Sequence, residues 1–386
     1  MKREDLDEKI VMAEMALARA EKKHGPEDGR LLKPLNHLGR LYMLQGRRPE
    51  SIPLLERALA IADRHGQGSS KAMAMLVNNL AVGLSMEGRI HESIPLFERS
   101  LALKEAIYGP AHPELANLLI NFGAACVSLN ELDRGQAMLE RALAISEKGR
   151  VDPADHLWVR LYINLSAVHQ HRKEFDKAKD YLERILGLKA AKLGDTTLAV
   201  VYNNLGRIAM EQGRQAEAAD LLQKALEAKE RHLGYDNAEV VPNLINLADL
   251  YLKMEDLDRA DTTFLRAIRI GEARLNPKHH MLAQAYHRYG HCLLCRGYYQ
   301  TSGEYFNKSA EITTATLGPD HPEMAGINQG LGDLALAEGD AASALVYYGR
   351  ALEVLRKCRG PESQEAAELE RKMEQVRKNT DATERY

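Results

Sequence analysis

Apolar residues recur along the chain at helical spacing, and the whole pattern repeats about every 42 residues. In each period a large apolar residue, here called the anchor, precedes a small residue. The anchors are Leu38, Leu80, Phe122, Leu165, Leu205, Leu247, Tyr289 and Leu331. Their successive intervals are 42, 42, 43, 40, 42, 42 and 42 residues, and this regularity predicts a tandem repeat.

Each period predicts a hairpin of two helices, A and B, that approach each other closely. Helix A carries the anchor and the small residue after it, and helix B carries a small residue 13 positions past the anchor and a bulky one 17 past it. Eight positions past most anchors stands a residue type that tolerates left-handed backbone at a helix end. These turn residues are Gly46, Gly88, Asn130, Gly213, Gly297 and Gly339.

The pattern therefore predicts an all-α fold, an α-solenoid of about eight helix-turn-helix hairpins with a capping helix at each end. A single hairpin cannot bury its apolar face, so neighbouring hairpins must stack. We expect an N-terminal capping helix over 1–26, eight repeats over 27–358, a C-terminal capping helix over 359–378 and a frayed tail over 379–386. The capping stripes are Leu6, Ile10, Ala13, Leu17 and Ala20, and Ala366, Leu369, Met373 and Val376.

The composition of the chain limits the classes of partner that we expect the protein to bind. The 52 basic and 55 acidic residues give a net charge of −3, without the basic excess of a nucleic-acid-binding protein. Four cysteines are too few for a disulfide framework in 386 residues. The N-terminal residues lack the apolar core of a signal peptide, and no apolar run is long enough for a membrane helix. We expect a cytoplasmic monomer without a membrane partner.

Two connectors carry a family resemblance. They read Gly109-Pro110-Ala111-His112-Pro113-Glu114 and Gly318-Pro319-Asp320-His321-Pro322-Glu323. Together with the repeat positions, over residues 27–358, they resemble the tetratricopeptide repeats (TPRs) of kinesin light chains and their bacterial relatives. The resemblance implies a right-handed superhelix with the A helices along its concave surface.

An asparagine ladder is the main candidate site. The residue before the anchor is asparagine in five consecutive repeats: Asn79, Asn121, Asn164, Asn204 and Asn246. Asparagine is a poor choice for a helix interior, whereas its amide can pair with the backbone of any extended peptide. In the families that the chain resembles, such asparagines hold the ligand backbone. The alternative is a structural role, in which the amides bridge adjacent helices.

Basic residues are predicted on the same surface. Arg40, Arg160, Arg207 and Arg288 project to the concave side in the geometry that the resemblance implies, and Arg pairs bidentately with carboxylates. This favours an acidic peptide or a free terminal carboxylate as ligand. The alternative is ordinary solvated charge, partly offset by acidic neighbours.

Repeat seven carries a possible metal site. His287, His291 and Cys295 follow one another at intervals of four, on one helix face. Such ligands suit zinc, but a structural zinc site needs four, so polar groove residues without a metal are the expected reading. Cys292 and Cys295 form a Cys-x-x-Cys motif without the βαβ context of a redox site. We therefore assign no cofactor.

These patterns predict a non-catalytic scaffold or adaptor that binds a protein or peptide. No phosphate-binding loop, nucleophile elbow or His-Glu-x-x-His motif is present in the sequence. Two alternatives stay open. The first is a sensory or regulatory module that binds a small peptide or metabolite and controls a partner protein. The second is a self-assembling structural protein.

Overall fold

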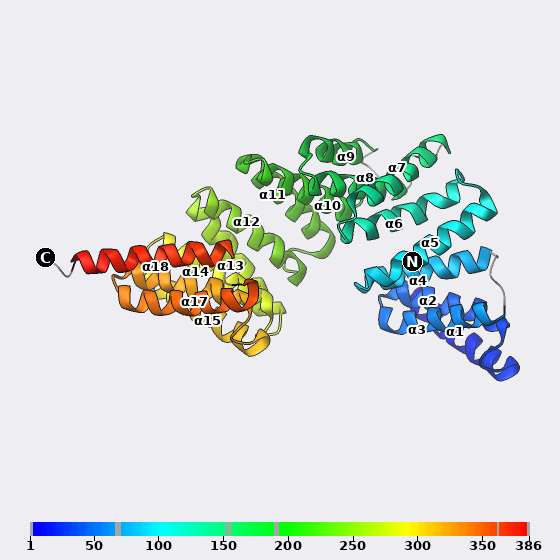
Figure 1. Ribbon diagram of the computed structural model, residues 1–386, viewed down its shortest axis with the longest axis horizontal. Coiled ribbons are helices and arrows are strands. Elements are labelled where there is room, and N and C mark those ends of the chain that lie inside the picture. Colours follow the sequence, from blue (N-terminus) through cyan, green and yellow to red (C-terminus); the bar gives the residue numbers. More distant parts are fainter. Residues whose placement is uncertain are drawn as a thin grey trace. The chain divides into compact units, whose positions relative to one another are not determined.

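The computed structural model describes residues 3–65, 71–149, 151–152, 156–188, 193–360 and 363–383. Within these residues the chain forms eighteen α-helices and short 3₁₀ turns. Figure 1 shows the ribbon coloured along the sequence. No described helix is long and apolar enough to span a lipid bilayer. The all-α solenoid predicted from the repeat is confirmed.

Sixteen of the described helices form eight consecutive hairpins, each an A helix followed by a B helix. The A helices are α2 (Leu32–Gln45), α4 (Lys71–Met86), α6 (Ala116–Ser128), α8 (His156–His171), α10 (Asp195–Glu211), α12 (Val241–Lys253), α14 (His280–Cys295) and α16 (Pro322–Ala337). The B helices are α3 (Arg48–Arg64), α5 (Ile90–Tyr108), α7 (Leu132–Lys148), α9 (Phe175–Gly187), α11 (Gln215–Leu233), α13 (Leu257–Arg274), α15 (Tyr299–Leu317) and α17 (Ala341–Arg359). Helices α1 (Arg3–His24) and α18 (Gln364–Thr383) flank them.

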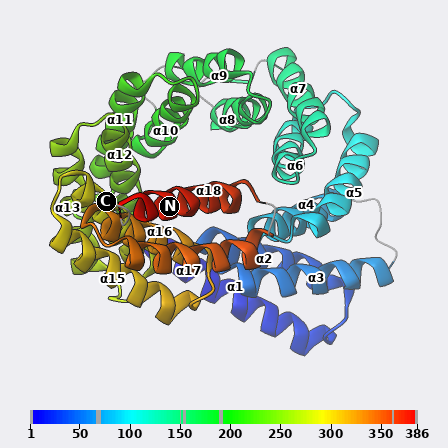
Figure 2. The ribbon, with the colours of Figure 1, turned by 60° about the vertical axis from the view of Figure 1, so that its left-hand side comes forward.

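The chain divides into two compact units, Met1–Leu193 and Gly194–Tyr386. Hairpins one to four belong to the first unit with α1, and hairpins five to eight belong to the second with α18. Neighbouring A helices contact each other directly, for example α6 with α8 in the first unit and α12 with α14 in the second. In Figure 2, α6 and α8 accordingly lie on the inner side of α7 and α9. The A helices thus line the concave side within each unit.

Every hairpin turns through one residue with left-handed backbone. The six predicted turn residues have φ between 62° and 85°. The sequence did not predict the other two, Lys173 at φ 59° and Glu255 at φ 60°, although both stand eight positions past their anchors. Residues other than glycine and asparagine are strained at positive φ, so lysine and glutamate do not indicate a left-handed turn by their residue type. Only their place, eight residues past the anchor, indicates these two turns.

The predicted contacts between small and bulky residues hold the two helices of a hairpin together. A Cβ atom added to Gly39 would lie 2.8 Å from Leu55, and one added to Gly332 would lie 2.5 Å from Tyr348. Gly123 faces Leu139 at 2.7 Å in the same way. Because these glycines lack a Cβ, the bulky side chain of helix B lies directly on the backbone of helix A.

Both flanking helices bury the stripes expected of caps. Leu6, Ile10 and Leu17 of α1 are less than 9% exposed, and the four predicted residues of α18 are equally buried. Helix α1 also exposes Val11, Met12 and Met15. Helix α18 continues beyond the predicted end at 378 to Thr383, and residues 384–386 of the predicted tail lie outside the described residues.

Arginines on B helices join consecutive hairpins. Arg57 donates to Glu21 at 2.5 Å and to the carbonyl oxygen of Pro26 at 2.6 Å. Arg141 and Arg266 repeat both contacts at the same sequence separations, with Glu105 and Pro110 and with Glu230 and Tyr235. Each arginine therefore links its helix to the preceding B-type helix and to the connector that follows that helix.

Candidate functional site

The five asparagines of the ladder lie on five consecutive A helices, α4, α6, α8, α10 and α12. The first three belong to the first unit, and Asn204 and Asn246 belong to the second. Four of them are partly exposed, and Asn246 is exposed. They share one register but not one pattern of hydrogen bonds, so they divide into three kinds.

Asn79 and Asn121 connect neighbouring A helices. The Asn79 amide donates to Oδ1 of Asn36 on α2 at 2.9 Å. Oδ1 of Asn121 accepts from Arg160 of α8 at 2.5 Å, and Arg160 also donates to Asn117 at 3.0 Å. These contacts are those expected of the structural alternative.

Asn164 and Asn204 donate to their own helices. Their amide nitrogens donate to the carbonyl oxygens of Arg160 and Val200, four residues earlier, at 2.9 and 3.0 Å. Within the described part of the chain, Oδ1 of each side chain accepts no hydrogen bond. An amide with one N–H committed to its helix still offers a second N–H and an acceptor oxygen.

Asn246 lines a cavity in the second unit. The cavity has a volume of about 290 Å³ and is formed by A helices α12, α14 and α16 together with Ser309 of α15. Arg288 contacts Asp249 there, with 3.5 Å between Nε and Oδ2, and Gln284 donates to Glu323 at 2.9 Å. Burial raises the pKa of Asp249, against the opposing effects of Arg288 and Lys253.

The predicted cations differ in their surroundings. Arg40, Arg160, Arg207 and Arg288 are all exposed residues on A helices. Arg288 faces a carboxylate, and Arg160 is held by two asparagines. The charge of Arg288 is therefore already partly compensated.

The histidines of repeat seven pair with each other. The Nε2 atoms of His287 and His291 lie 3.2 Å apart, and both rings contact Phe306. Burial, followed by the neighbouring His291 and Arg288, lowers the pKa of His287 to about 3, and burial also lowers the pKa of His291. Among the described residues, no three His, Cys, Asp or Glu side chains are arranged to hold a metal ion.

The two cysteines of the Cys-x-x-Cys motif point in different directions. Cys292 is fully buried, and burial raises its thiol pKa to about 11. Cys295 is exposed and follows the histidines on the same helix. A protonated buried thiol is a poor nucleophile and a poor metal ligand.

Comparison with family models decides the family. Tetratricopeptide repeat models match residues 35–65, 72–148, 159–231, 241–272 and 281–357, and one model alone covers more than half of the chain. The chain belongs to the tetratricopeptide repeat family. TPR domains generally bind proteins or peptides and are typically non-catalytic. No curated protein matches the chain.

Several solved TPR structures are similar to this chain. The quorum sensor NprR from B. thuringiensis, in its apo form, has a TM-score of 0.60 at 16% identity, covering 91% of this chain and 99% of that one. BtubC (BKLC) from P. vanneervenii has a TM-score of 0.51 at 23% identity, covering 59% and 92%. Repeats of a kinesin light chain from Podosopora anserina have a TM-score of 0.45 at 19% identity, covering 53% and 98%. These likenesses concern the fold.

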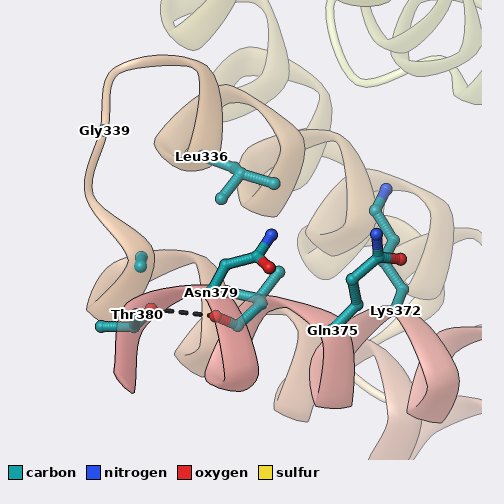
Figure 3. A pocket seen from close by; sticks show the side chains of 8 residues that line it. Leu336, Gly339, Lys372, Gln375, Asn379 and Thr380 are labelled. Atoms are coloured by element: carbon teal, nitrogen blue, oxygen red, sulfur yellow. Dashed lines mark hydrogen bonds between the residues drawn. The ribbon is translucent and has the colours of Figure 1, made fainter. Parts of the chain in front are cut away.

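A second cavity lies at the C-terminal end of the TPR array. It has a volume of about 520 Å³ and is bounded by Leu336, by the turn between α16 and α17, and by α18. Figure 3 shows Lys372, Gln375 and Asn379 of α18 beside it. No predicted site residue lies here, and most of its accessible surface is apolar.

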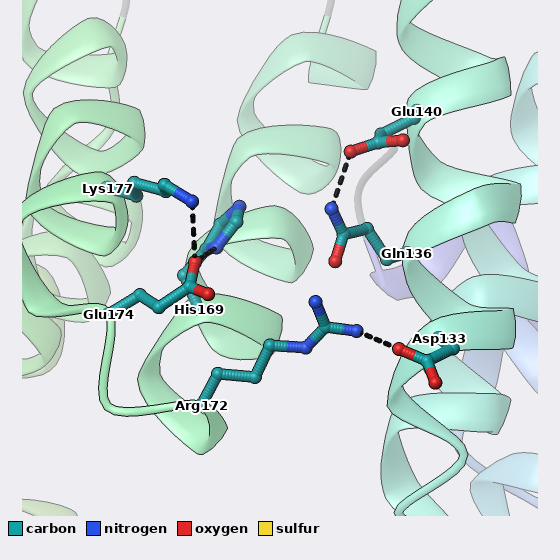
Figure 4. Close-up of polar contacts among 7 residues, drawn as sticks. All are labelled: Asp133, Gln136, Glu140, His169, Arg172, Glu174 and Lys177. Carbon is teal, nitrogen blue, oxygen red and sulfur yellow. Dashed lines mark hydrogen bonds and ion pairs between the residues drawn. The ribbon is translucent and has the colours of Figure 1, made fainter.

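A polar cluster joins hairpins three and four of the TPR array (Figure 4). Arg172 forms an ion pair with Asp133 of α7. His169, which is 4% exposed, contacts Glu174 at 2.7 Å, and Lys177 donates to the same carboxylate at 3.0 Å. Since Lys173 forms the left-handed turn between His169 and Glu174, this cluster braces a turn that has no glycine.

Sequence reasoning missed the structural role of the connector histidines. Nδ1 of His112 accepts from the backbone N–H of Glu114 at 3.2 Å, and His321 does the same for Glu323 at 3.3 Å. Asn237 occupies the equivalent position in hairpin six and accepts from Glu239 at 2.9 Å. A side-chain acceptor two residues before an N–H caps the start of a helix. The occurrence of His and Asn at one register was a usable signal.

Proposed function

We propose that this TPR protein is a non-catalytic scaffold that binds an extended peptide segment of a partner along its A helices. Three observations support the proposal. TPR domains generally bind proteins or peptides, the A helices line the concave side within each unit, and the asparagine ladder runs along these helices. The amide groups of the ladder can both donate to and accept from the backbone of an extended peptide.

The observation that carries the proposal is the unused hydrogen-bonding capacity of Asn164, Asn204 and Asn246. Asn164 and Asn204 are half-buried and Asn246 is exposed, and within the described residues none of their Oδ1 atoms accepts a hydrogen bond. Asn79 and Asn121, by contrast, already bridge helices. We therefore assign backbone binding to Asn164 within the first unit and to Asn204 and Asn246 within the second, and a structural role to Asn79 and Asn121.

Charge supports an acidic stretch of ligand at the first unit. Lys33, Arg40 and Arg160 are exposed on its A helices. The two asparagines that hold Arg160 are neutral amides that orient its guanidinium. Binding of an acidic peptide to this surface should weaken as salt is added, because exposed charges are screened.

A selected peptide tests the proposal. Peptides would be selected against the whole protein from a random displayed library, and their affinity measured by fluorescence polarisation. The variant Asn164→Ala, Asn204→Ala, Asn246→Ala should lose about tenfold or more in affinity, because each alanine removes a hydrogen-bonding amide. The matched control is Glu140→Ala, Asp180→Ala, Lys224→Ala on exposed B-helix positions.

Both variants must first give the circular dichroism spectrum and melting temperature of the wild type. Loss of affinity in the asparagine variant but not in the control supports the proposal. Equal affinity of all three proteins would show that the ladder does not bind the peptide, and the proposed function would then be wrong.

The sensory alternative is favoured by one observation, the cavity of about 290 Å³ in the second unit. Its size suits a small group and not a helix or strand. A sensory module should change conformation when such a ligand binds, so small-angle scattering with and without ligand distinguishes the two functions. A scaffold that only holds a peptide requires no change in the scattering curve.

A further inference from the structure

The cavity between α12, α14 and α16 is lined by an unusual number of acceptor oxygens. Carboxylates come from Asp249 of α12 and Glu323 of α16, and amide oxygens come from Asn246 and Gln284. The one cationic side chain among its lining residues is Arg288. We propose that this cavity binds a primary ammonium group of the ligand, either a lysine side chain or a free peptide amino terminus. The inference deepens the proposed function and rests on it.

The formal charge of the lining favours a cation. Asp249 and Glu323 carry two negative charges and Arg288 carries one positive charge. His287 adds none at neutral pH, since burial lowers its pKa to about 3. Lys253, which lies near Asp249, is exposed and is not part of the lining. One negative charge is therefore left for the ligand to neutralise.

Asp249 is poorly compensated by its protein partner. Its side chain is only 24% exposed, and its distance of 3.5 Å from Nε of Arg288 exceeds that of a direct charged hydrogen bond, about 2.8 Å. Burial raises the pKa of Asp249, which shows that its charged form is short of solvation. A second cation that donates directly to Oδ1 or Oδ2 would stabilise the charged Asp249 carboxylate more than water and Arg288 do.

Glu323 is held in place without being neutralised. Its Oε1 accepts from the uncharged amide of Gln284 at 2.9 Å, which fixes the carboxylate across the cavity from α12. An ammonium group has three N–H donors and no acceptor. It can therefore donate to the Asp249 carboxylate in a cavity that Glu323 and the Asn246 oxygen also line, whereas a carboxylate ligand would face two like charges.

Size and walls fit the end of an aliphatic amine. A volume of about 290 Å³ equals that of about ten water molecules, which is enough for a butylammonium chain. Ile245, Ile327 and Pro322 supply apolar surface for the methylenes, in the way that lysine stems lie along apolar side chains. Gly326 keeps the wall open, since a Cβ there would lie 3.1 Å from the His287 ring.

The test uses blocked pentapeptides and the whole protein. The probes are acetylated, amidated Ala-Ala-Lys-Ala-Ala, the same peptide with norleucine in place of lysine, and Ala-Ala-norleucine-Ala-Ala amide with a free amino terminus. Binding is followed by the NMR shifts of isoleucine methyl groups, because Ile245 and Ile327 line the cavity. Ile120 of α6, buried in the first unit, reports shifts that are not local to the cavity.

The lysine peptide or the free-amine peptide should bind at least about tenfold more tightly than blocked norleucine, and the difference between them identifies the source of the ammonium group. Asp249→Asn should abolish that preference. Arg288→Gln should tighten binding, because it removes the competing cation. Asp220→Asn, an exposed carboxylate on α11, should change nothing. All variants are first checked for the wild-type melting temperature.

Three results would overturn the inference: an affinity for blocked norleucine equal to that for both amine-bearing peptides, weaker binding in Arg288→Gln, or no shift of Ile245 and Ile327 at millimolar peptide. The Arg288 result separates an ammonium ligand from a carboxylate ligand by its sign. If library-selected peptides still need Asn164 and Asn204 while these tests fail, the scaffold function stands without this cavity. If the lysine peptide binds and the affinity of the library-selected peptides is unchanged in Asn164→Ala, Asn204→Ala, the cavity stands without the scaffold function.

Discussion

The guanidinium of Arg266 donates to the carboxylate of Glu230 at 2.5 Å, and these side chains are only 17% and 13% exposed. The pair joins α13 to the preceding B helix, α11. Arg64 and Glu27 form a comparable ion pair at the surface, with exposures of 53% and 66%. The protein therefore contains one Arg–Glu ion pair that is shielded from water and a second one that is exposed to it.

Arg266→Met should lower the free energy of unfolding by about 3 kcal/mol, because Glu230 then lacks its cation in a shielded place. Arg64→Met should lower it much less, since water and salt already screen that pair. Urea denaturation followed by circular dichroism measures both. Equal losses would mean that burial does not determine the contribution of the pair.

Glycine should improve the two hairpin turns that lack one. Lys173→Gly and Glu255→Gly should each raise the free energy of unfolding by about 1 kcal/mol, because positive φ strains a side chain but not glycine. Lys224→Gly, inside α11, should instead lower it by about 1 kcal/mol. Denaturant midpoints of the three variants provide the measurement, and a loss in either turn variant would contradict the strain argument.

Two glycines of hairpin eight should respond oppositely to alanine. A Cβ on Gly332 would lie 2.5 Å from the fully buried ring of Tyr348, so Gly332→Ala should destabilise the protein by about 2 kcal/mol. Gly349, within α17, has nothing within 4 Å, so Gly349→Ala should stabilise it by about 1 kcal/mol. Thermal melting of both variants checks the sign of each change.

Acid should destabilise the second unit through His287. Above about pH 6.5 the ring is neutral in both the folded and the unfolded chain. As pH falls from 6.5 towards 3, the unfolded chain takes up the proton while the folded chain does not, so the free energy of unfolding falls. Between pH 7 and pH 5 the wild type should lose about 2 kcal/mol more than His287→Gln. Parallel urea titrations at the two pH values would reveal equal losses if His287 does not contribute.

The sequence alone predicted the hairpins, because repeat packing depends on side-chain size at fixed positions. The sequence shows each such contact as a small and a bulky residue at a constant spacing, for example Gly39 with Leu55 and Gly332 with Tyr348. The turns at Lys173 and Glu255 were not predicted, because neither lysine nor glutamate favours left-handed backbone. There the surrounding hairpins determine the turn and override local preference.

The sequence predicted the repeat position that the ladder asparagines occupy, but not the hydrogen bonds that each of them forms. Asn79 and Asn246 occupy the same repeat position, yet one amide bridges two helices and the other faces a cavity. Which of these occurs depends on the neighbouring hairpin, for example on whether Asn36 lies within reach. The sequence indicated that acidic neighbours partly offset the cations of the A helices, and Asp249 beside Arg288 is one of them, but the spacing alone did not show which cation it contacts.

The arginine links between hairpins recur at constant sequence separations, so whole hairpins can be removed without changing the type of link. Arg57, Arg141 and Arg266 each lie 36 residues after their carboxylate partner and 31 residues after their carbonyl partner. Removing residues 22–105 would bring Arg141 to the same separation from Glu21 that Arg57 has now. The protein can therefore be shortened by two whole hairpins while keeping a native junction, so the length of its binding surface is a variable that evolution or an engineer can adjust in steps.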